Sequence, residues 1–281
     1  MCPLWFILSG VSTVLTTADA EDSEAGAASL SKQAQVGLYY RTLFRTWGRQ
    51  HWWPAQSRFE VIVGAYLTQN TAWTNVERTL QQLRSQGLLN LKGIRETPLS
   101  QLESLIRSAG YFRQKARRLK TFVAFLDERY AGSLDHMFAQ PTEKLRAELL
   151  LLNGVGPETA DSILLYAGQH PVFVVDAYTR RIFDRHGILP ANCSYEEIRS
   201  LCESAFDVGA RVPSLGAKRG ARLHPSTRHT PSKMSLAKRT PLAQVYNEMH
   251  GLIVGVGKHY CLKSKPKCDD CPLQKFLPGV K

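Results

Sequence analysis

The N-terminal apolar stretch lacks the features of an export or membrane segment. No lysine or arginine precedes residues 4–15, although the small residues at 18–20 resemble a signal-peptide cleavage site. The stretch is also too short to span a bilayer. Because the residues up to about 33 carry no sustained helical period, we expect 1–33 to be a disordered or mis-assigned tail. We expect no membrane partner.

Acidic residues are scarce, with 24 Asp and Glu against 36 Lys and Arg and a net charge of +12. This balance favours a polyanionic partner, of which nucleic acid is the commonest for a soluble protein. The segment 209–240 holds eight basic residues, three prolines and no acidic residue. We predict a flexible basic insertion there, which either clamps a DNA backbone or is a solvated surface loop.

Cysteines are few and unevenly placed. Of the six, Cys261, Cys268 and Cys271 lie within eleven residues, which favours a metal site over a disulfide framework. Such thiolates can bind iron–sulfur or zinc when another ligand completes the shell. Cys193 and Cys202 are further candidates only if the fold brings them near.

Strand patterns are almost absent. The one candidate, 172–175, is short enough to be an extended connector. Apolar residues instead recur at helical spacing in a series of segments, namely 36–47, 59–67, 73–86, 99–109, 114–130, 141–152, 157–167, 177–186, 195–205 and 242–256. The sequence therefore predicts an all-α fold, large enough for one large or two small domains.

A glycine turn separates two of these helices, at Asn153-Gly154-Val155-Gly156. The glycines permit a tight turn and leave backbone N–H groups uncovered. Pro157 suits the first position of the next helix, whose exposed amides can hold a phosphate. A turn of this kind often has no further role, but here we predict that Gly154, Val155 and Gly156 bind DNA.

Asp176 follows the apolar connector and begins the next helix. Any aspartate in this place would cap the helix. A carboxylate beside a DNA-binding hairpin can also stabilise cationic character at the anomeric carbon of a sugar and orient water. The two roles are compatible, and we predict that Asp176 is catalytic.

Hairpin, second helix, connector and Val-Asp together resemble the endonuclease III superfamily of helix-hairpin-helix DNA glycosylases, over about 52–271. The segments 52–54, 59–61, 67–71, 110–116 and 158–161 are most similar to the 3-methyladenine glycosylase branch. The resemblance implies double-stranded DNA with a flipped, damaged base held between two helical lobes. We expect a monomer in the cytoplasm, associated with the nucleoid.

The resemblance also implies a domain plan. One lobe would combine 34–58 with 170–260 and carry the insertion 209–240, while the other would comprise 59–169 and carry the hairpin helices at 141–167. A cysteine-rich loop, 261–281, would follow.

The resemblance to this superfamily also limits which reactions we expect. Bifunctional members use a lysine two residues after the second glycine as an amine nucleophile that cleaves the strand, but Glu158 stands there. Adenine-excising members use a glutamate four or five residues before the position of Gln69, where this chain has Ala65 and Gly64. We therefore expect a monofunctional hydrolytic glycosylase, acting on alkylated purines, which leave readily.

Substrate contacts are assigned on the same basis. Trp52 and Trp53 offer a π surface for the flipped base, or else they pack a domain junction. Gln69 resembles the residue that fills the gap left by the flipped nucleotide, or it is a surface amide. Lys258 is interpreted as a solvated lysine.

The cysteine spacing C-x6-C-x2-C resembles the first three ligands of the superfamily's four-iron four-sulfur cluster. The fourth ligand would stand at Leu277, so a cluster on three cysteines and a degenerate loop both stay open. Two rival functions also remain. One is an endonuclease III-like glycosylase and lyase for oxidised pyrimidines, and the other is a DNA-binding module without catalysis.

Overall fold

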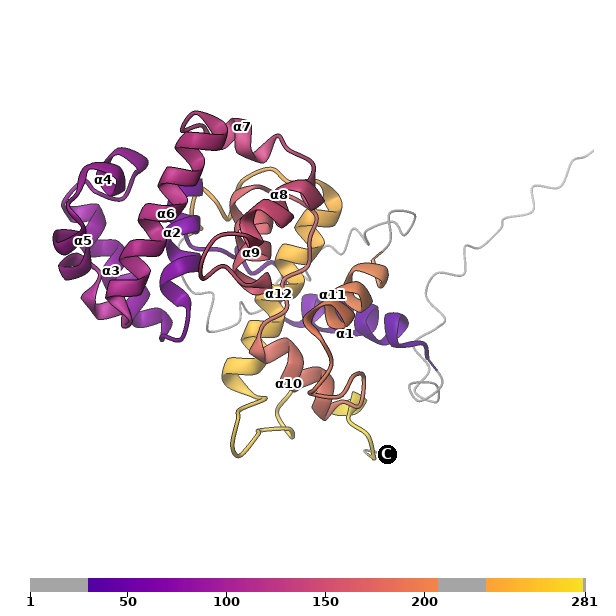
Figure 1. Cartoon of the computed structure of the whole chain (residues 1–281). Helices are drawn as coiled ribbons and strands as arrows, with labels where there is room; N and C mark the ends of the chain where they lie inside the picture. The colour runs from indigo at the N-terminus through magenta and orange to yellow at the C-terminus, as the bar shows by residue number, and fades with distance from the viewer. Residues whose placement is uncertain (1–29, 207–230, 280–281) are drawn as a thin grey trace, which may run out of the picture.

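The computed structural model describes residues 30–206 and 231–279, and every regular element in these ranges is helical (Figure 1). The α-helices are α1 Lys32–Trp47, α2 Arg58–Thr68, α3 Trp73–Ser85, α4 Leu91–Glu96, α5 Leu99–Leu105, α6 Phe112–Tyr130, α7 Leu134–Phe138, α8 Thr142–Leu150, α9 Pro157–Ser162, α10 Ala177–Arg185, α11 Tyr195–Ser204 and α12 Pro241–His259. Short 3-10 turns are η2 Arg107–Ala109 and η5 Gln274–Phe276, and η3 Ile163–Ala167 is a π-helix. The prediction of an all-α fold is confirmed.

All ten predicted helices are present, with ends that differ by a few residues. Two of them change type before they end, since 99–109 finishes as η2 and 157–167 finishes as η3. The short helices α4 and α7 were not predicted. Each spans fewer than two turns and depends on a polar cap, Asn90 for α4 and Ser133 for α7, so neither builds a readable apolar period.

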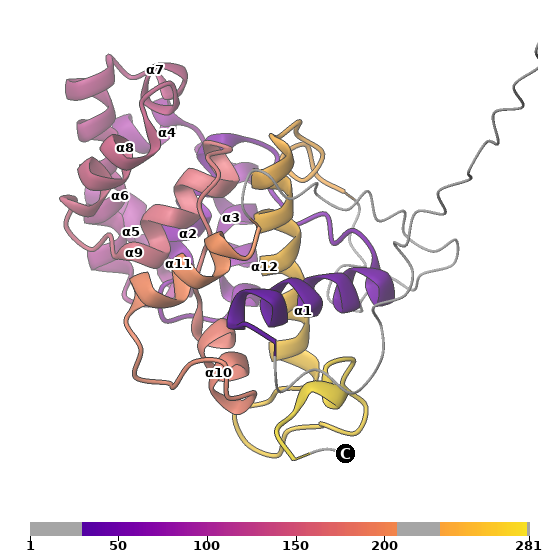
Figure 2. The same cartoon turned by 90° about the vertical axis from the view of Figure 1, so that its right-hand side faces the viewer.

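The helices form two groups, with α12 between them. Helices α2 to α9 lie together on one side of Figure 1, and α1, α10 and α11 lie on the other. Helix α12 contacts α1, α10 and η3, and Figure 2 shows α1 crossing it. This arrangement agrees with two helical lobes, whereas the predicted lobe boundaries stay predictions. None of the helices in the described ranges is long and apolar enough to span a membrane.

The last part of the predicted insertion, 231–239, contacts the segment that precedes α2, and its flexibility stays a prediction. Ser232 Oγ donates a hydrogen bond to the carbonyl of Trp53, and Met234 N donates to the carbonyl of Ala55, both at 3.0 Å. Ser232 and Met234 are buried. They supply hydrogen-bond donors to backbone carbonyls in the irregular segment that precedes α2. Residues 209–230 of the insertion and 1–29 of the tail lie outside the described residues.

Candidate active site

The predicted hairpin lies between α8 and α9. Gly154 has a φ of 79°, which favours glycine, and a Cβ there would lie 1.9 Å from Nε of Arg118, so the Arg118 side chain would have to move. Gly156 has extended backbone and open space where its Cβ would stand. Val155 is buried and fixes the turn to the core. The structure thus forms the predicted turn, and its contact with DNA stays a prediction.

Gln69 ends α2 and ties it to this hairpin. Its Nε2 donates to the carbonyl of Gly154 and to Oγ1 of Thr159, both at 2.9 Å. Its Oε1 accepts a hydrogen bond of 2.7 Å from Arg118. The side chain predicted to fill the gap in the DNA is therefore held at the hairpin by three hydrogen bonds.

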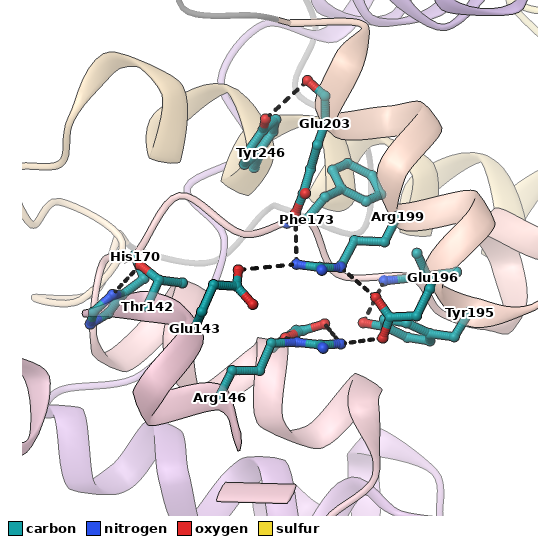
Figure 3. Close-up of polar contacts among 12 residues, drawn as sticks. Thr142, Glu143, Arg146, His170, Phe173, Tyr195, Glu196, Arg199, Glu203 and Tyr246 are labelled. Carbon is teal, nitrogen blue, oxygen red and sulfur yellow. Dashed lines mark hydrogen bonds and ion pairs between the residues drawn. The ribbon is translucent and has the colours of Figure 1, made fainter. Parts of the chain in front are cut away.

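An ion-pair network fixes the hairpin helices to the other lobe. Arg146 of α8 donates to both carboxylate oxygens of Asp161 on α9, at 2.7 and 3.1 Å, and to Glu196 on α11 at 2.6 Å. Arg199 extends the network along α11 (Figure 3). Because Asp161 is fully buried, this network holds the position of α9 against α11.

Asp176 caps α10 and is 8% exposed. Its Oδ1 accepts hydrogen bonds from the backbone N and Oγ1 of Thr179, at 2.7 and 2.9 Å, and its Oδ2 lies 3.5 Å from Nε2 of His250. Burial alone would raise the pKa of Asp176, but His250 and Thr179 outweigh it and hold that pKa below its usual value. The carboxylate is therefore ionised at neutral pH.

Two residues that sequence reasoning missed complete this arrangement. Tyr166, fully buried on η3, lies with its hydroxyl 2.5 Å from Nδ1 of His250 on α12. Tyr166, His250 and Asp176 thus form a chain across three elements. One signal was available, since Glu248 and His250 are polar residues beside the apolar residues of α12, and buried polar groups usually have partners.

The two tryptophans predicted to contact the base have different environments. Trp53 is 6% exposed, with its ring centroid 4.9 Å from that of Tyr166, and its ring fills the space next to Gly64, where a Cβ would lie 3.4 Å away. Trp52 is only half-buried and its ring lies edge-on to His250, with centroids 6.2 Å apart. Trp53 is packed against α2, α3 and η3, so Trp52 is the stronger candidate to contact a base.

Two further charged groups face Asp176. Glu158, the second residue of α9, is exposed to solvent, yet desolvation by the surrounding protein and the charge of Asp176 raise its pKa to about 7. Lys258 Nζ lies 5.9 Å from the centroid of the Trp52 ring. Lys258 is exposed to solvent, yet desolvation by the surrounding protein lowers its pKa, and the charge of Asp176 opposes that effect.

The three predicted metal ligands line one cavity. Cys261, Cys268 and Cys271 surround it together with His186 and Leu277. Leu277 occupies the place where a fourth cysteine was expected and offers no donor atom. The described residues therefore supply three thiols of the four that a cluster of this type uses.

The other candidate ligands are bonded to another residue or do not line this cavity. Nδ1 of His186 lies 2.8 Å from the hydroxyl of Tyr39, and neither Cys193 nor Cys202 lines this cavity. Within 30–206 and 231–279, no three His, Cys, Asp or Glu side chains converge on a single-ion site. Arg185 holds the loop to α10 through the carbonyls of residues 262 and 263.

Comparisons with known proteins place this chain in a family. Residues 63–207 match the family described as HhH-GPD superfamily base excision DNA repair protein. A Methanocaldococcus jannaschii protein with the name "Putative DNA repair glycosylase" is 40% identical over 248 residues, which are 88% of this chain and 97% of that protein.

Solved structures of DNA glycosylases are also similar to this chain. The Helicobacter pylori 3-methyladenine DNA glycosylase bound to 1,N6-ethenoadenine has 26% identity and a TM-score of 0.61, covering 82% of this chain and 98% of its own. A trapped endonuclease III–DNA covalent intermediate has a TM-score of 0.64 over 89% and 96% of the two chains, and its 21% identity shows the fold alone. The predicted resemblance is confirmed: the chain belongs to the HhH-GPD superfamily of base excision DNA repair proteins.

Proposed function

We propose that this protein is a monofunctional DNA glycosylase, which hydrolyses the N-glycosidic bond of a damaged base in double-stranded DNA. The observation that carries the proposal is the buried, ionised carboxylate of Asp176 at the start of α10. A fixed negative charge stabilises a cationic sugar as the base departs. Glu158 stands where strand-cleaving members carry a lysine, and a carboxylate cannot form an imine.

Alkylated purines are the substrate class that we assign. Such bases leave readily, so the enzyme has mainly to flip and hold them. The half-buried ring of Trp52 beside His250 offers a surface for stacking. The similarity to a 3-methyladenine glycosylase bound to 1,N6-ethenoadenine supports the same class.

DNA would be held at the hairpin. Gly154, Val155 and Gly156 would approach a phosphate through their backbone, and Gln69 would leave its bonds to the hairpin to fill the gap beside a flipped nucleotide. The net charge of +12 supports this partner. We expect the protein to act as a monomer on chromosomal DNA.

Asp176→Asn tests the chemical role directly. Asparagine caps a helix as well as aspartate does, so the fold should persist while the charge is lost. On duplexes that carry one alkylated, oxidised, deaminated or mismatched base, the wild-type protein should release free base. The variant should bind the same DNA and release the base at least about a hundredfold more slowly. If no lesion is released by either protein, the DNA-binding module without catalysis is the better description.

Lys258 favours the second candidate, a bifunctional glycosylase and lyase. Its amine lies near both Trp52 and Asp176, and desolvation lowers its pKa, which suits a nucleophile. Borohydride reduction on abasic DNA separates the two functions. We expect no covalent adduct with the wild-type protein, and an adduct lost in Lys258→Gln would instead establish the lyase.

Cys261, Cys268 and Cys271 would hold an iron–sulfur cluster through three thiolates. All three line one cavity, which supports this assignment, and the cluster would have no step in the proposed hydrolysis. Protein purified without oxygen should contain iron and acid-labile sulfide, and Cys268→Ser should lose both. Wild-type protein that lacks iron and sulfide, with its thiols free to react, would identify a degenerate loop.

A further inference from the structure

Two carboxyl groups share the site, and their surroundings differ. Asp176 is buried, and its Oδ1 is already occupied by two hydrogen bonds from Thr179. Glu158 reaches solvent, and its carboxyl has no hydrogen-bond or ion-pair partner in the described ranges 30–206 and 231–279. The Asp176 carboxylate is therefore held by hydrogen bonds, whereas the Glu158 carboxylate has its lone pairs free.

Several charged or titratable groups face Glu158 from the elements around it. They are Asp176 and Arg180 on α10, His250 on α12, Tyr166 on η3 and Tyr195 on α11. Desolvation and the charge of Asp176 raise the pKa of Glu158 to about 7, against the smaller opposing effects of His250 and Arg180. Near pH 7, therefore, Glu158 exists both with and without its proton.

Glycoside hydrolases commonly divide hydrolysis at a sugar carbon between two carboxyl groups, and in the inverting enzymes one of them takes a proton from the attacking water. A fixed carboxylate that stays ionised stabilises the developing cation. A general base works best with a pKa near the working pH and with free lone pairs. When the pKa of one neighbouring carboxyl group is lowered and that of the other is raised, the first stays ionised and the second can exchange a proton.

We propose that Glu158 is the general base that takes a proton from the attacking water, while Asp176 stabilises the cationic sugar. This inference rests on the proposed glycosylase function. The C1′–N bond breaks and its electron pair leaves with the base. The water oxygen bonds to C1′ and one water proton passes to the Glu158 carboxylate. A purine alkylated on a ring nitrogen carries a positive charge and leaves as a neutral base, so it needs no proton, and Glu158 returns the water proton to solvent.

The pH dependence of base release tests this role. Only ionised Glu158 accepts a proton, so the single-turnover rate should be constant above about pH 7 and should fall about tenfold per unit well below it. Glu158→Gln should lower the rate roughly 10²- to 10⁴-fold and abolish this dependence, with unchanged affinity for the same duplex.

Glu128→Gln is the matched control, because it removes the same charge from an exposed position on α6. It should retain the wild-type rate and pH profile. Glu158→Asp, which keeps a carboxylate, should recover part of the lost rate. The proposal is overturned if Glu158→Gln keeps the wild-type rate and profile, or if its slower rate follows only from weaker DNA binding.

A second variant tests where residue 158 lies without requiring base release. In Glu158→Lys, an amine replaces the carboxylate and can attack C1′ of an abasic site, with loss of water to form an imine. Borohydride should trap this variant on abasic DNA, and should trap neither the wild-type protein nor Glu158→Gln. If folded Glu158→Lys gives no adduct, the side chain does not reach the sugar and the proposal fails. An adduct together with no base release by wild-type protein would refute the glycosylase function alone.

Discussion

Asp176 shows how one residue can serve the fold and the site together. Its backbone begins α10, and its Oδ1 caps the helix through Thr179. The same hydrogen bonds help to keep the carboxylate ionised although it is buried. His250 and Tyr166 then fix the other side of the group. Because capping fixes the orientation of the carboxylate, the proposed catalysis and the local stability would depend on the same geometry.

The two hairpin glycines should respond differently to alanine. Gly154→Ala forces a side chain into a positive φ and into Arg118, so it should lower the free energy of unfolding by more than about 1–2 kcal/mol. Gly156→Ala meets open space at an extended backbone and should change stability by less than about 0.5 kcal/mol. Urea denaturation of both variants measures the difference. Equal losses would mean that neither the positive φ nor the contact with Arg118 makes residue 154 more sensitive than residue 156.

At the scale of elements, the hairpin helices are short and rely on tertiary partners. Helix α8 has nine residues and α9 has six, lengths at which an isolated helix is not stable in water. The ion pairs of Arg146 with Asp161 and Glu196 supply tertiary stabilisation that these short helices lack by themselves. The position of Glu158 at the start of α9 depends on the same anchor.

Arg146→Ala should therefore destabilise the protein strongly. It leaves the carboxylate of Asp161 fully buried without its cation, which costs about 3–5 kcal/mol. Arg95→Ala is the control, because Arg95 pairs with Asp127 at 2.6 Å, with both side chains over a third exposed. A loss of at most about 1 kcal/mol is expected for this control. Similar unfolding free energies for the two variants would contradict the burial argument.

At the scale of the whole molecule, positive charge exceeds negative charge by twelve. Exposed lysines at 263, 265 and 267 lie on the loop that carries the cysteines, next to α10 and the end of α12. Neutralising phosphates releases counterions, so DNA affinity should fall linearly with salt on logarithmic axes. The cysteine loop would then be an electrostatic contact whether or not it holds a cluster.

Replacing these three lysines by glutamine should weaken binding to undamaged duplex DNA. If each contacts one phosphate, the salt slope should become shallower by roughly 0.9 per lysine. The control replaces Lys32, Lys92 and Lys144, which are also exposed but lie on α1, α4 and α8. Fluorescence anisotropy at several salt concentrations measures both slopes. An unchanged slope in the loop variant would remove this surface from the DNA interface.

Helices, hairpin and the place of Asp176 could be predicted from the sequence because their causes are local. Apolar periods, caps and glycine positions act within a few residues, and the family match confirms the assignment they supported. The role of Gln69 and the burial of Trp53 were left open by the sequence, since each depends on side chains from distant segments.

The sequence by itself determined an all-α protein with a glycine hairpin and a carboxylate that begins the next helix, because short-range backbone chemistry specifies these features. The tertiary structure alone decided which groups surround that carboxylate. Tyr166 and His250 lie 84 residues apart in the chain, and residues 232 and 234 bond to the carbonyls of Trp53 and Ala55. Such contacts form when distant helices pack, and no local pattern in the sequence encodes them.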